Sequence, residues 1–166
     1  LPWLGKAVMG VIKRRRVYAP FRKPKKFDRN LVVIGAGAAG LVSSYIAATV
    51  RAKVTLVEDG KMGGDCLNFG CVPSKALIKS ARVAKTVRDA ADYGVQAQAP
   101  TVDFPAVMRR VEEVIKAIEP HDSVERFTGV GVDCVAGYAT IVDPWTVKIR
   151  RHDATEQVLT TRSIVI

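Results

Sequence analysis

Two cysteines stand five positions apart in the segment GGDCLNFGCVPSK, and thiols at this spacing can do redox chemistry. Cys66 and Cys71 could form a structural disulfide, supply half of a metal site, or open and close a disulfide during a reaction. In a regular α-helix their Cα atoms would lie about 8.7 Å apart, whereas a disulfide needs about 5.5 to 6 Å. A bond between them therefore requires a break in the helix, and Asn68 and Gly70 are residue types that tolerate an unusual backbone. Pro73 is typical of a first helical turn, which puts Cys71 near a helix N-terminus, where the dipole stabilises a thiolate.

The remaining candidate metal ligands do not form a recognisable zinc pattern. The chain has one further cysteine, Cys134, and two histidines, His121 and His152, at unrelated spacings, whereas a structural zinc site needs four ligands. No metal site is therefore predicted. Cys134 lies among strand-type apolar residues and is interpreted as a buried, inert thiol. Three cysteines in 166 residues is also far below the density of a disulfide-stapled secreted domain, which favours a reducing, cytoplasmic setting and a catalytic pair.

A glycine-rich turn precedes the cysteines and predicts a dinucleotide site. Gly35, Gly37 and Gly40 form GxGxxG directly after an apolar strand at 31–34 and at the start of a helical pattern that runs to about Val50. In this context the glycines allow a tight turn, the close approach of a pyrophosphate, and close helix–strand packing. Glu58 ends the next strand, eighteen residues past Gly40, where a carboxylate can accept hydrogen bonds from a ribose diol. The competing interpretation is a glycine turn that binds nothing.

The rest of the chain predicts helices followed by short strands. An amphipathic helix follows Pro73 and ends near Gly94, and a second begins at the cap residue Asp103. From Val130 onward the apolar period is two, and strands are predicted around residues 132–135, 138–141, 145–150 and 158–160. The predicted class is therefore α/β, Rossmann-like, with a β-α-β start, helices and then a small β-meander.

The net charge of +10 is confined to one end of the chain. Residues 1–29 carry ten Lys or Arg and one acid, for a net charge of +9, whereas residues 30–166 carry sixteen basic and fifteen acidic side chains. Prolines and like charges in this arm predict an extended, solvated segment. It suits an anionic membrane surface, a nucleic-acid backbone, or the role of a charged linker; nothing in the sequence suggests base readout. No apolar run reaches the roughly 18 residues that a membrane span needs.

Both ends of the sequence predict that it is part of a longer polypeptide. The first residue is Leu1 rather than Met, and the apolar run SIVI at 163–166 has no turn or cap after it. We therefore divide the chain into a basic linker or juxtamembrane arm, 1–29, and an incomplete nucleotide-binding domain, 30–166.

Three stretches, VVIGAGAAG, Glu58 and GGDCLNFGCVPSKAL, resemble the N-terminal half of the FAD domain of the pyridine-nucleotide disulfide oxidoreductases. This CxxxxC flavoprotein group includes dihydrolipoyl dehydrogenase, glutathione reductase and mercuric reductase. The resemblance covers about Asn30 to Ile166. GGDC departs from the more usual Gly-Gly-Thr-Cys and, together with CVPSKAL and HDSVERFTGVGV, resembles the mercuric-reductase-like branch. Asp65 thus stands where the family has a flavin-contacting threonine.

The resemblance implies roles for individual residues. Cys71 would be the thiol on the flavin side, and Cys66 would exchange with substrate. Lys75 would lie near the flavin ring, and the strand at 137–139 would meet the adenine. The implied FAD-binding set is Gly35, Ala36, Gly37, Ala38, Ala39, Gly40, Glu58, Gly63, Gly64, Asp65, Lys75 and Ala139.

The implied activity is that of an FAD-dependent oxidoreductase. NAD(P)H would reduce the flavin, and the Cys66–Cys71 disulfide would pass electrons to a small disulfide or a metal ion such as Hg²⁺. Dihydrolipoyl dehydrogenase is the first alternative, and a membrane-tethered or nucleic-acid-tethered flavin module is the alternative from another class. In the family, the nicotinamide domain and the dimerisation domain with its His–Glu acid/base pair would follow Ile166. The chain alone is therefore expected to be inactive, the complete protein a homodimer, and the location cytoplasmic or at the inner face of a membrane.

Overall fold

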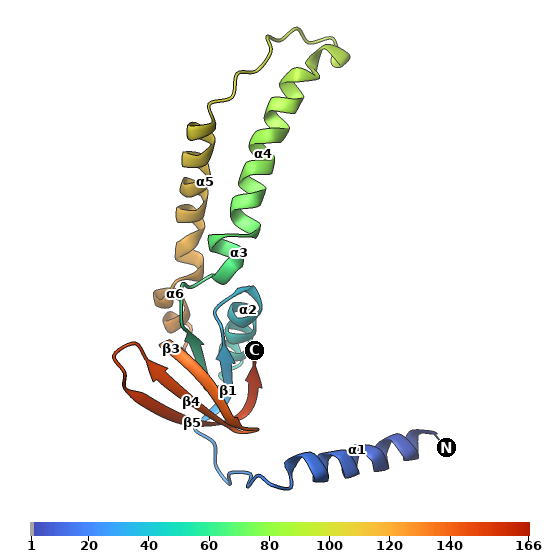
Figure 1. The fold of residues 1–166 in the computed structure, drawn as a ribbon, viewed down its shortest axis with the longest axis vertical. Coiled ribbons are helices and arrows are strands. Elements are labelled where there is room, and N and C mark those ends of the chain that lie inside the picture. The colour runs from blue at the N-terminus through green and yellow to red at the C-terminus, as the bar shows by residue number, and fades with distance from the viewer. Residues whose placement is uncertain (1) are drawn as a thin grey trace.

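A computed structural model describes residues 2–166, except for the side chains of Pro2, Leu4 and Lys13 (Figure 1). The helices are α1 (Pro2–Tyr18), α2 (Ala38–Thr49), α3 (Gly64–Asn68), α4 (Cys71–Arg88), α5 (Phe104–Ile118) and α6 (Val124–Gly129), with 3₁₀ turns η1 (Ala90–Tyr93) and η2 (Glu119–Asp122). The strands are β1 (Arg29–Ile34), β2 (Val54–Glu58), β3 (Val132–Asp143), β4 (Thr146–Arg151) and β5 (Glu156–Val165).

The five strands form two sheets that share their longest members. Strands β5, β1, β2 and β3 are parallel and lie in that order, with Leu31 of β1 opposite Val54 on one side and Ser163 on the other. Strands β3, β4 and β5 pair antiparallel as a meander. Because β3 and β5 are long enough to take part in both sheets, the strand order closes on itself.

Apolar side chains are buried on both faces of the parallel sheet, as expected for strands with nearly continuous apolar sequence. The core on one face lies against α2 and α6, and its buried members are Val33, Ala36, Leu41, Ala48, Val54, Leu56, Phe127 and Val132. The core on the other face lies under the meander and contains Val32, Val57, Val135, Val147, Ile149 and Leu159. Alternate residues of β1 and β2 thus point into different cores.

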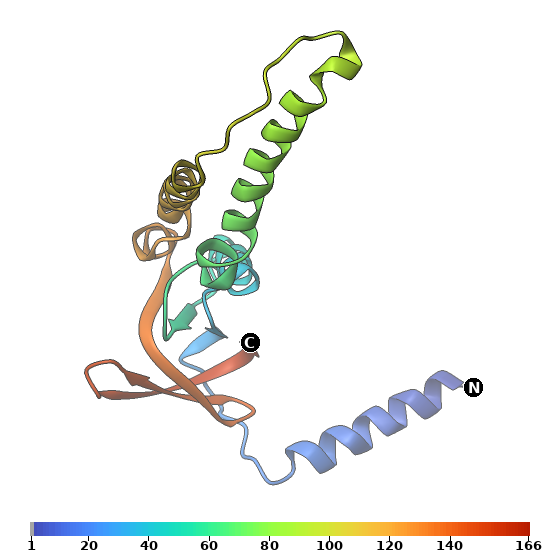
Figure 2. The same ribbon diagram turned by 45° about the horizontal axis from the view of Figure 1, so that its top comes forward.

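Helices α4 and α5 form a hairpin that extends away from the sheet (Figures 1 and 2). The Asp103 carboxylate caps α5 by accepting a hydrogen bond from the Ala106 N–H at 3.0 Å. The Arg110 side chain of α5 donates to the Ala76 carbonyl of α4 at 3.3 Å, which links the two helices near the base of the hairpin. Much of the hairpin is exposed, including Ile78 at 55% and Phe104 at 63%.

The predicted α/β class with a parallel sheet is confirmed, and two details of the prediction are wrong. The strands expected at 132–135 and 138–141 are one strand, β3, because Gly137 adopts a φ of 151° that glycine allows and pairs with Arg151 of β4. The basic arm is not extended throughout, since α1 continues to Tyr18 and only residues 19–28 lack helix or strand. Among the described residues, no helix is long and apolar enough to cross a bilayer.

Candidate functional site

The glycine turn between β1 and α2 has the geometry that its sequence predicts. Gly35 has φ of 96°, a left-handed conformation that favours glycine. A Cβ on Gly40 would lie 1.9 Å from the Gly35 carbonyl oxygen, so only glycine lets α2 approach the strand this closely. A Cβ on Gly37 would meet nothing within 4 Å. The N-terminus of α2, with its free N–H groups, therefore faces open space beside Gly37.

The carboxylate of Glu58, at the end of β2, binds the backbone of the glycine turn. One carboxylate oxygen accepts a hydrogen bond from the Ala36 N–H at 2.5 Å, and the other accepts from the Gly60 N–H at 2.7 Å. Ala36 is fully buried in the core, and its N–H is satisfied by Glu58. Each carboxylate oxygen keeps a lone pair free for a further donor.

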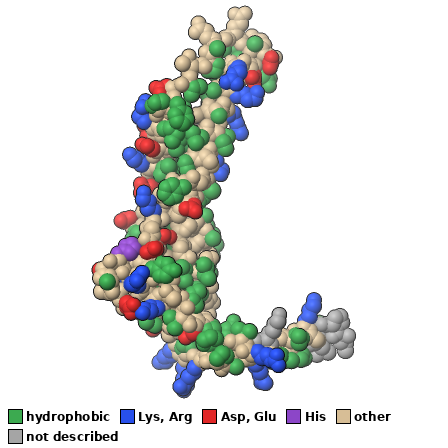
Figure 3. Space-filling view, viewed as in Figure 1, with side chains coloured by type: hydrophobic (Ala, Val, Ile, Leu, Met, Phe, Trp, Pro, Cys, Tyr) green, Lys and Arg blue, Asp and Glu red, His purple; other side chains and the backbone are tan. Residues whose placement is uncertain are grey.

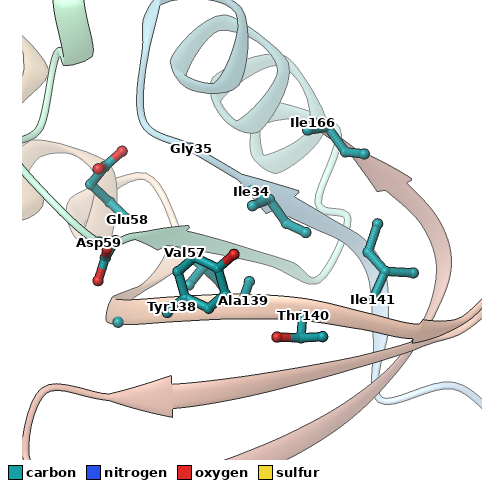
Figure 4. Close-up of a pocket in the computed structure, with 11 residues that line it drawn as sticks. Ile34, Gly35, Val57, Glu58, Asp59, Tyr138, Ala139, Thr140, Ile141 and Ile166 are labelled. Carbon is teal, nitrogen blue, oxygen red and sulfur yellow. The ribbon is translucent and has the colours of Figure 1, made fainter.

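A cavity of about 480 Å³ opens at the carboxyl ends of β1 and β2 (Figure 4). Glu58 and Asp59 lie at one end of it, and Ile34, Ile141 and Ile166 lie at the other (Figure 4). The remaining lining residues are Gly35, Val57, Gly137, Tyr138, Ala139 and Thr140. The edge of a parallel sheet at the carboxyl ends of its strands is where α/β proteins bind nucleotides.

The glycine turn also touches the cysteine segment. A Cβ on Gly64 would lie 2.8 Å from the Cα of Gly37, and Gly64 itself has φ of 53°. Its neighbour Gly63 has φ of 84°, and a Cβ there would lie 2.4 Å from the buried side chain of Leu67. Gly64 thus allows α3, which carries Cys66, to pack directly against the glycine turn.

The two cysteines lie on either side of a helix break, the arrangement expected if they form a disulfide. Cys66 is in α3 and Cys71 is the first residue of α4. The Asp65 carbonyl accepts hydrogen bonds from the N–H groups of Phe69 and Gly70, which ends α3. A Cβ on Gly70 would lie 3.0 Å from that carbonyl oxygen, so the close approach favours glycine.

Asn68 does not supply the unusual backbone conformation that its residue type suggested. It remains helical, and its side-chain amide donates to the carbonyls of Met62 and Gly64 at 3.1 and 2.8 Å. These bonds fix α3 to the glycines before it. The break itself therefore involves Phe69 and Gly70, and Asn68 holds the segment in place.

Both thiols are free, and their environments differ. Cys71 is exposed, whereas Cys66 is half-buried. The pKa of the Cys66 thiol is raised, chiefly by its side-chain hydrogen bond with Cys71 and then by burial, while the charge of Lys75 opposes the shift. Cys71 also lines a cavity of about 290 Å³ between α4 and α5, together with the cationic side chains of Lys75, Lys79 and Arg110. Cys71 therefore lies at the start of α4, next to the positive charges that line this cavity.

Most predicted site residues come together in this arrangement. Gly35, Glu58 and Ala139 line the cavity, and Gly64 packs the cysteine segment against Gly37 of the turn. Asp65 and Lys75 are exposed beside the thiols, on α3 and α4.

Tyr138 belongs to the segment 137–139 that was expected to meet the adenine, whereas the polar lining residues Asp59 and Thr140 were missed. Only their adjacency to the predicted Glu58 and Ala139 signals them. Cys134 was expected to be buried; it is half-buried against the α2-side core, and burial is the main cause of its raised pKa.

These residues fit the nucleotide portion of FAD. An extended nucleotide needs a glycine turn with room at a helix N-terminus, an acidic residue for the ribose, and a cavity for the base. Gly37, Glu58 and the cavity beside Ala139 provide these features.

Known proteins with similar sequences support the same assignment. A family profile described as "Pyridine nucleotide-disulphide oxidoreductase" matches residues 29–166. Dihydrolipoyl dehydrogenase of Chlamydia pneumoniae is 35% identical over 132 residues, 79% of this chain and 28% of that protein. Dihydrolipoyl dehydrogenase of Geobacillus stearothermophilus is 37% identical over 130 residues, 78% of this chain and 27% of the relative. Dihydrolipoamide dehydrogenase of Chaetomium thermophilum is 32% identical over 162 residues, 96% of this chain and 31% of the relative.

The chain thus spans less than a third of the length of these curated relatives. The profile match nevertheless covers both the glycine turn and the two cysteines. Geometry and sequence comparison lead to the same conclusion, that this chain belongs to the pyridine nucleotide-disulphide oxidoreductase family.

Proposed function

We propose that this chain supplies the dithiol and the nucleotide-binding part of an FAD-dependent oxidoreductase that acts on a dihydrolipoyl dithiol. The observation that carries the proposal is the placement of Cys66 and Cys71 across a helix break that contacts the glycine turn through Gly64. The reported relatives are named for dihydrolipoyl or dihydrolipoamide oxidation. We therefore put this substrate ahead of the small disulfide or Hg²⁺ that the GGDC segment suggested.

The two thiols have separate roles in the proposed reaction. With Cys66 and Cys71 joined in a disulfide, a substrate thiolate attacks Cys66, and Cys71 leaves as the thiolate. The second substrate thiol then displaces Cys66 from the mixed disulfide, so the substrate becomes a disulfide and the protein a dithiol. Cys71 suits the leaving role because it begins α4 and lies beside Lys75, Lys79 and Arg110.

FAD, when bound, would accept the electron pair from the protein dithiol and pass it to a pyridine nucleotide. The residues proposed to hold it are the glycine turn from Gly35 to Gly40, Glu58, the stretch from Gly63 to Asp65, Lys75 and Ala139. Glu58 would accept the ribose hydroxyls with its free lone pairs. The remaining family domains, a homodimer and a catalytic acid/base pair also belong to this proposal.

The test uses the complete, flavin-loaded polypeptide and two matched variants. Cys66→Ser leaves the Cys71 thiolate and should give a long-wavelength charge-transfer absorbance with oxidised flavin, whereas Cys71→Ser should not. Both variants should lose dihydrolipoamide-dependent reduction of NAD⁺. Identical spectra from the two variants, or absorbance in Cys71→Ser alone, would refute the division of roles.

Substrate choice is tested separately in the unsubstituted protein. NAD⁺ reduction by dihydrolipoamide is expected to be faster than NAD(P)H oxidation by either a small disulfide or Hg²⁺. The opposite ranking would restore the mercuric-reductase-like interpretation, for which Asp65 at the threonine position is the specific observation.

A further inference from the structure

Three contacts hold the basic arm against the sheets. The ring of Tyr18, at the end of α1, lies 5.4 Å from that of Trp145 in the β3–β4 turn. The Arg162 guanidinium lies 5.8 Å from the centre of the Phe27 ring. Asp28 exchanges hydrogen bonds with Thr160 of β5, including one at 2.8 Å from the Thr160 N–H to the carboxylate. The arm and the β3–β4 turn therefore form one surface.

Basic and aromatic groups meet at the centre of this surface. Two hollows, of about 570 and 870 Å³, share Arg14, Tyr18, Lys23 and Trp145 as lining residues. The Lys23 ammonium also lies 6.0 Å from the centre of the Trp145 ring. Lys and Arg side chains gather along this lower edge of the molecule, next to exposed apolar groups (Figure 3).

Most of the basic residues of α1 lie toward its C-terminal end. The first three turns expose Trp3 at 65%, Met9 at 59% and Val11 at 55%, whereas the last turn is basic with Arg15 and Arg16. An apolar helical segment next to basic residues and a Trp–Tyr pair is the pattern of a lipid interface, where rings and cations sit at the headgroups. A nucleic acid would neutralise the cations but leave the apolar turns in water.

We propose that α1, residues 19–28 and Trp145 form a docking surface for membranes that contain anionic lipids. The apolar turns of α1 enter the headgroup and acyl boundary, and the cations around Trp145 bind the anionic headgroups. The α4–α5 hairpin points away from α1 (Figures 1 and 2), so docking leaves the Cys66–Cys71 segment open to solution. This inference does not depend on the proposed redox activity.

The first test uses the two tryptophans, which are the only ones in the chain and both belong to the docking surface. The single-tryptophan variants Trp3→Phe and Trp145→Phe are titrated with phosphatidylcholine vesicles, with and without phosphatidylserine. With phosphatidylserine, both variants should shift their emission to shorter wavelength, and lipids brominated in the acyl chain should quench Trp3 more strongly. A shift of Trp3 alone would exclude Trp145 from the surface, and no shift in either variant would overturn the proposal.

The second test measures the charge requirement by vesicle co-sedimentation. A triple variant, Arg14→Gln, Arg15→Gln and Lys23→Gln, should lower the partition coefficient about a hundredfold, since each cation at an anionic surface contributes about fivefold. The control has the same charge change in the hairpin, Arg82→Gln, Arg88→Gln and Lys116→Gln, and should bind like the unsubstituted chain.

Three outcomes of the second test would overturn the proposal. Equal loss in both triple variants would show a non-specific charge effect. Equal binding to vesicles without phosphatidylserine would remove the anionic requirement. Binding to duplex DNA without binding to vesicles would assign the surface to nucleic acid instead. Circular dichroism of each variant confirms that its helix content is retained.

Discussion

Replacing Gly40 by alanine tests the close contact between α2 and the glycine turn. The new Cβ would lie 1.9 Å from the Gly35 carbonyl oxygen and 3.2 Å from the Val33 side chain, whereas real Cβ contacts almost never fall below 3.0 Å. The oxygen belongs to the backbone between β1 and α2, so relief requires the helix to move by about 1 Å relative to the sheet. Such overpacking costs typically about 1 to 3 kcal/mol, and a backbone obstacle puts Gly40→Ala at or above the upper figure.

The expected loss of stability is opposite in sign to the change that helix propensity alone would give, so the measurement distinguishes the two effects. At an unobstructed helix position, glycine to alanine stabilises by about 1 kcal/mol. Gly37→Ala is the matched control, because its Cβ would meet nothing within 4 Å and its φ of −74° suits alanine. Urea unfolding should therefore show a loss of about 3 kcal/mol for Gly40→Ala and a change within about 1 kcal/mol for Gly37→Ala. Equal stability of the two variants would show that the contact with Gly35 is not as close as the structure has it.

Three further predictions concern titratable and buried groups. The raised pKa of Cys66 should make it react more slowly with iodoacetamide than Cys71 near neutral pH, as peptide mass spectrometry would show; faster labelling of Cys66 would contradict this. Hydrogen bonds from Thr160 lower the pKa of Asp28 below its ordinary value of 3.8. The ionised carboxylate therefore stabilises the folded protein above that pH, and this contribution to the free energy of unfolding is lost as the pH falls through the lower folded-state pKa. Asp28→Asn should thus flatten the acid side of a plot of urea midpoint against pH, and an unchanged slope would refute the linkage. Among the described residues, the buried Ser44 hydroxyl has no hydrogen-bond partner, so Ser44→Ala should raise the free energy of unfolding by about 1 kcal/mol, and a loss in thermal or urea unfolding would indicate an unseen partner.

Local sequence rules predicted the parts of the site whose geometry is set within a few residues. The turn at Gly35 needs positive φ and Gly40 needs close packing; each is a backbone requirement that the residue type reveals. The break between Cys66 and Cys71 followed in the same way from a distance that a continuous helix cannot provide.

Features that depend on distant segments could not be predicted in this way. The cavity brings Asp59 together with Thr140, about eighty positions later, and no local pattern relates them. The helix α1 was missed because its apolar turns and its basic end were judged as one charged arm. The contact of Tyr18 with Trp145 joins the arm to a turn that comes much later in the sequence.

The closed strand order has a consequence for how the chain folds as it is synthesised. Strand β1 pairs with β5, so Arg29 meets Thr161 only after more than a hundred further residues have left the ribosome. Until then β1 presents an unpaired edge, and Val32 and Val33 lack their β5 partners, Ile164 and Val165. Closing so long a loop is slow, since its entropic cost precedes any gain from the contact. We expect the nascent chain to be a chaperone client until β5 emerges, with the β3–β5 meander folding first because its pairings are local.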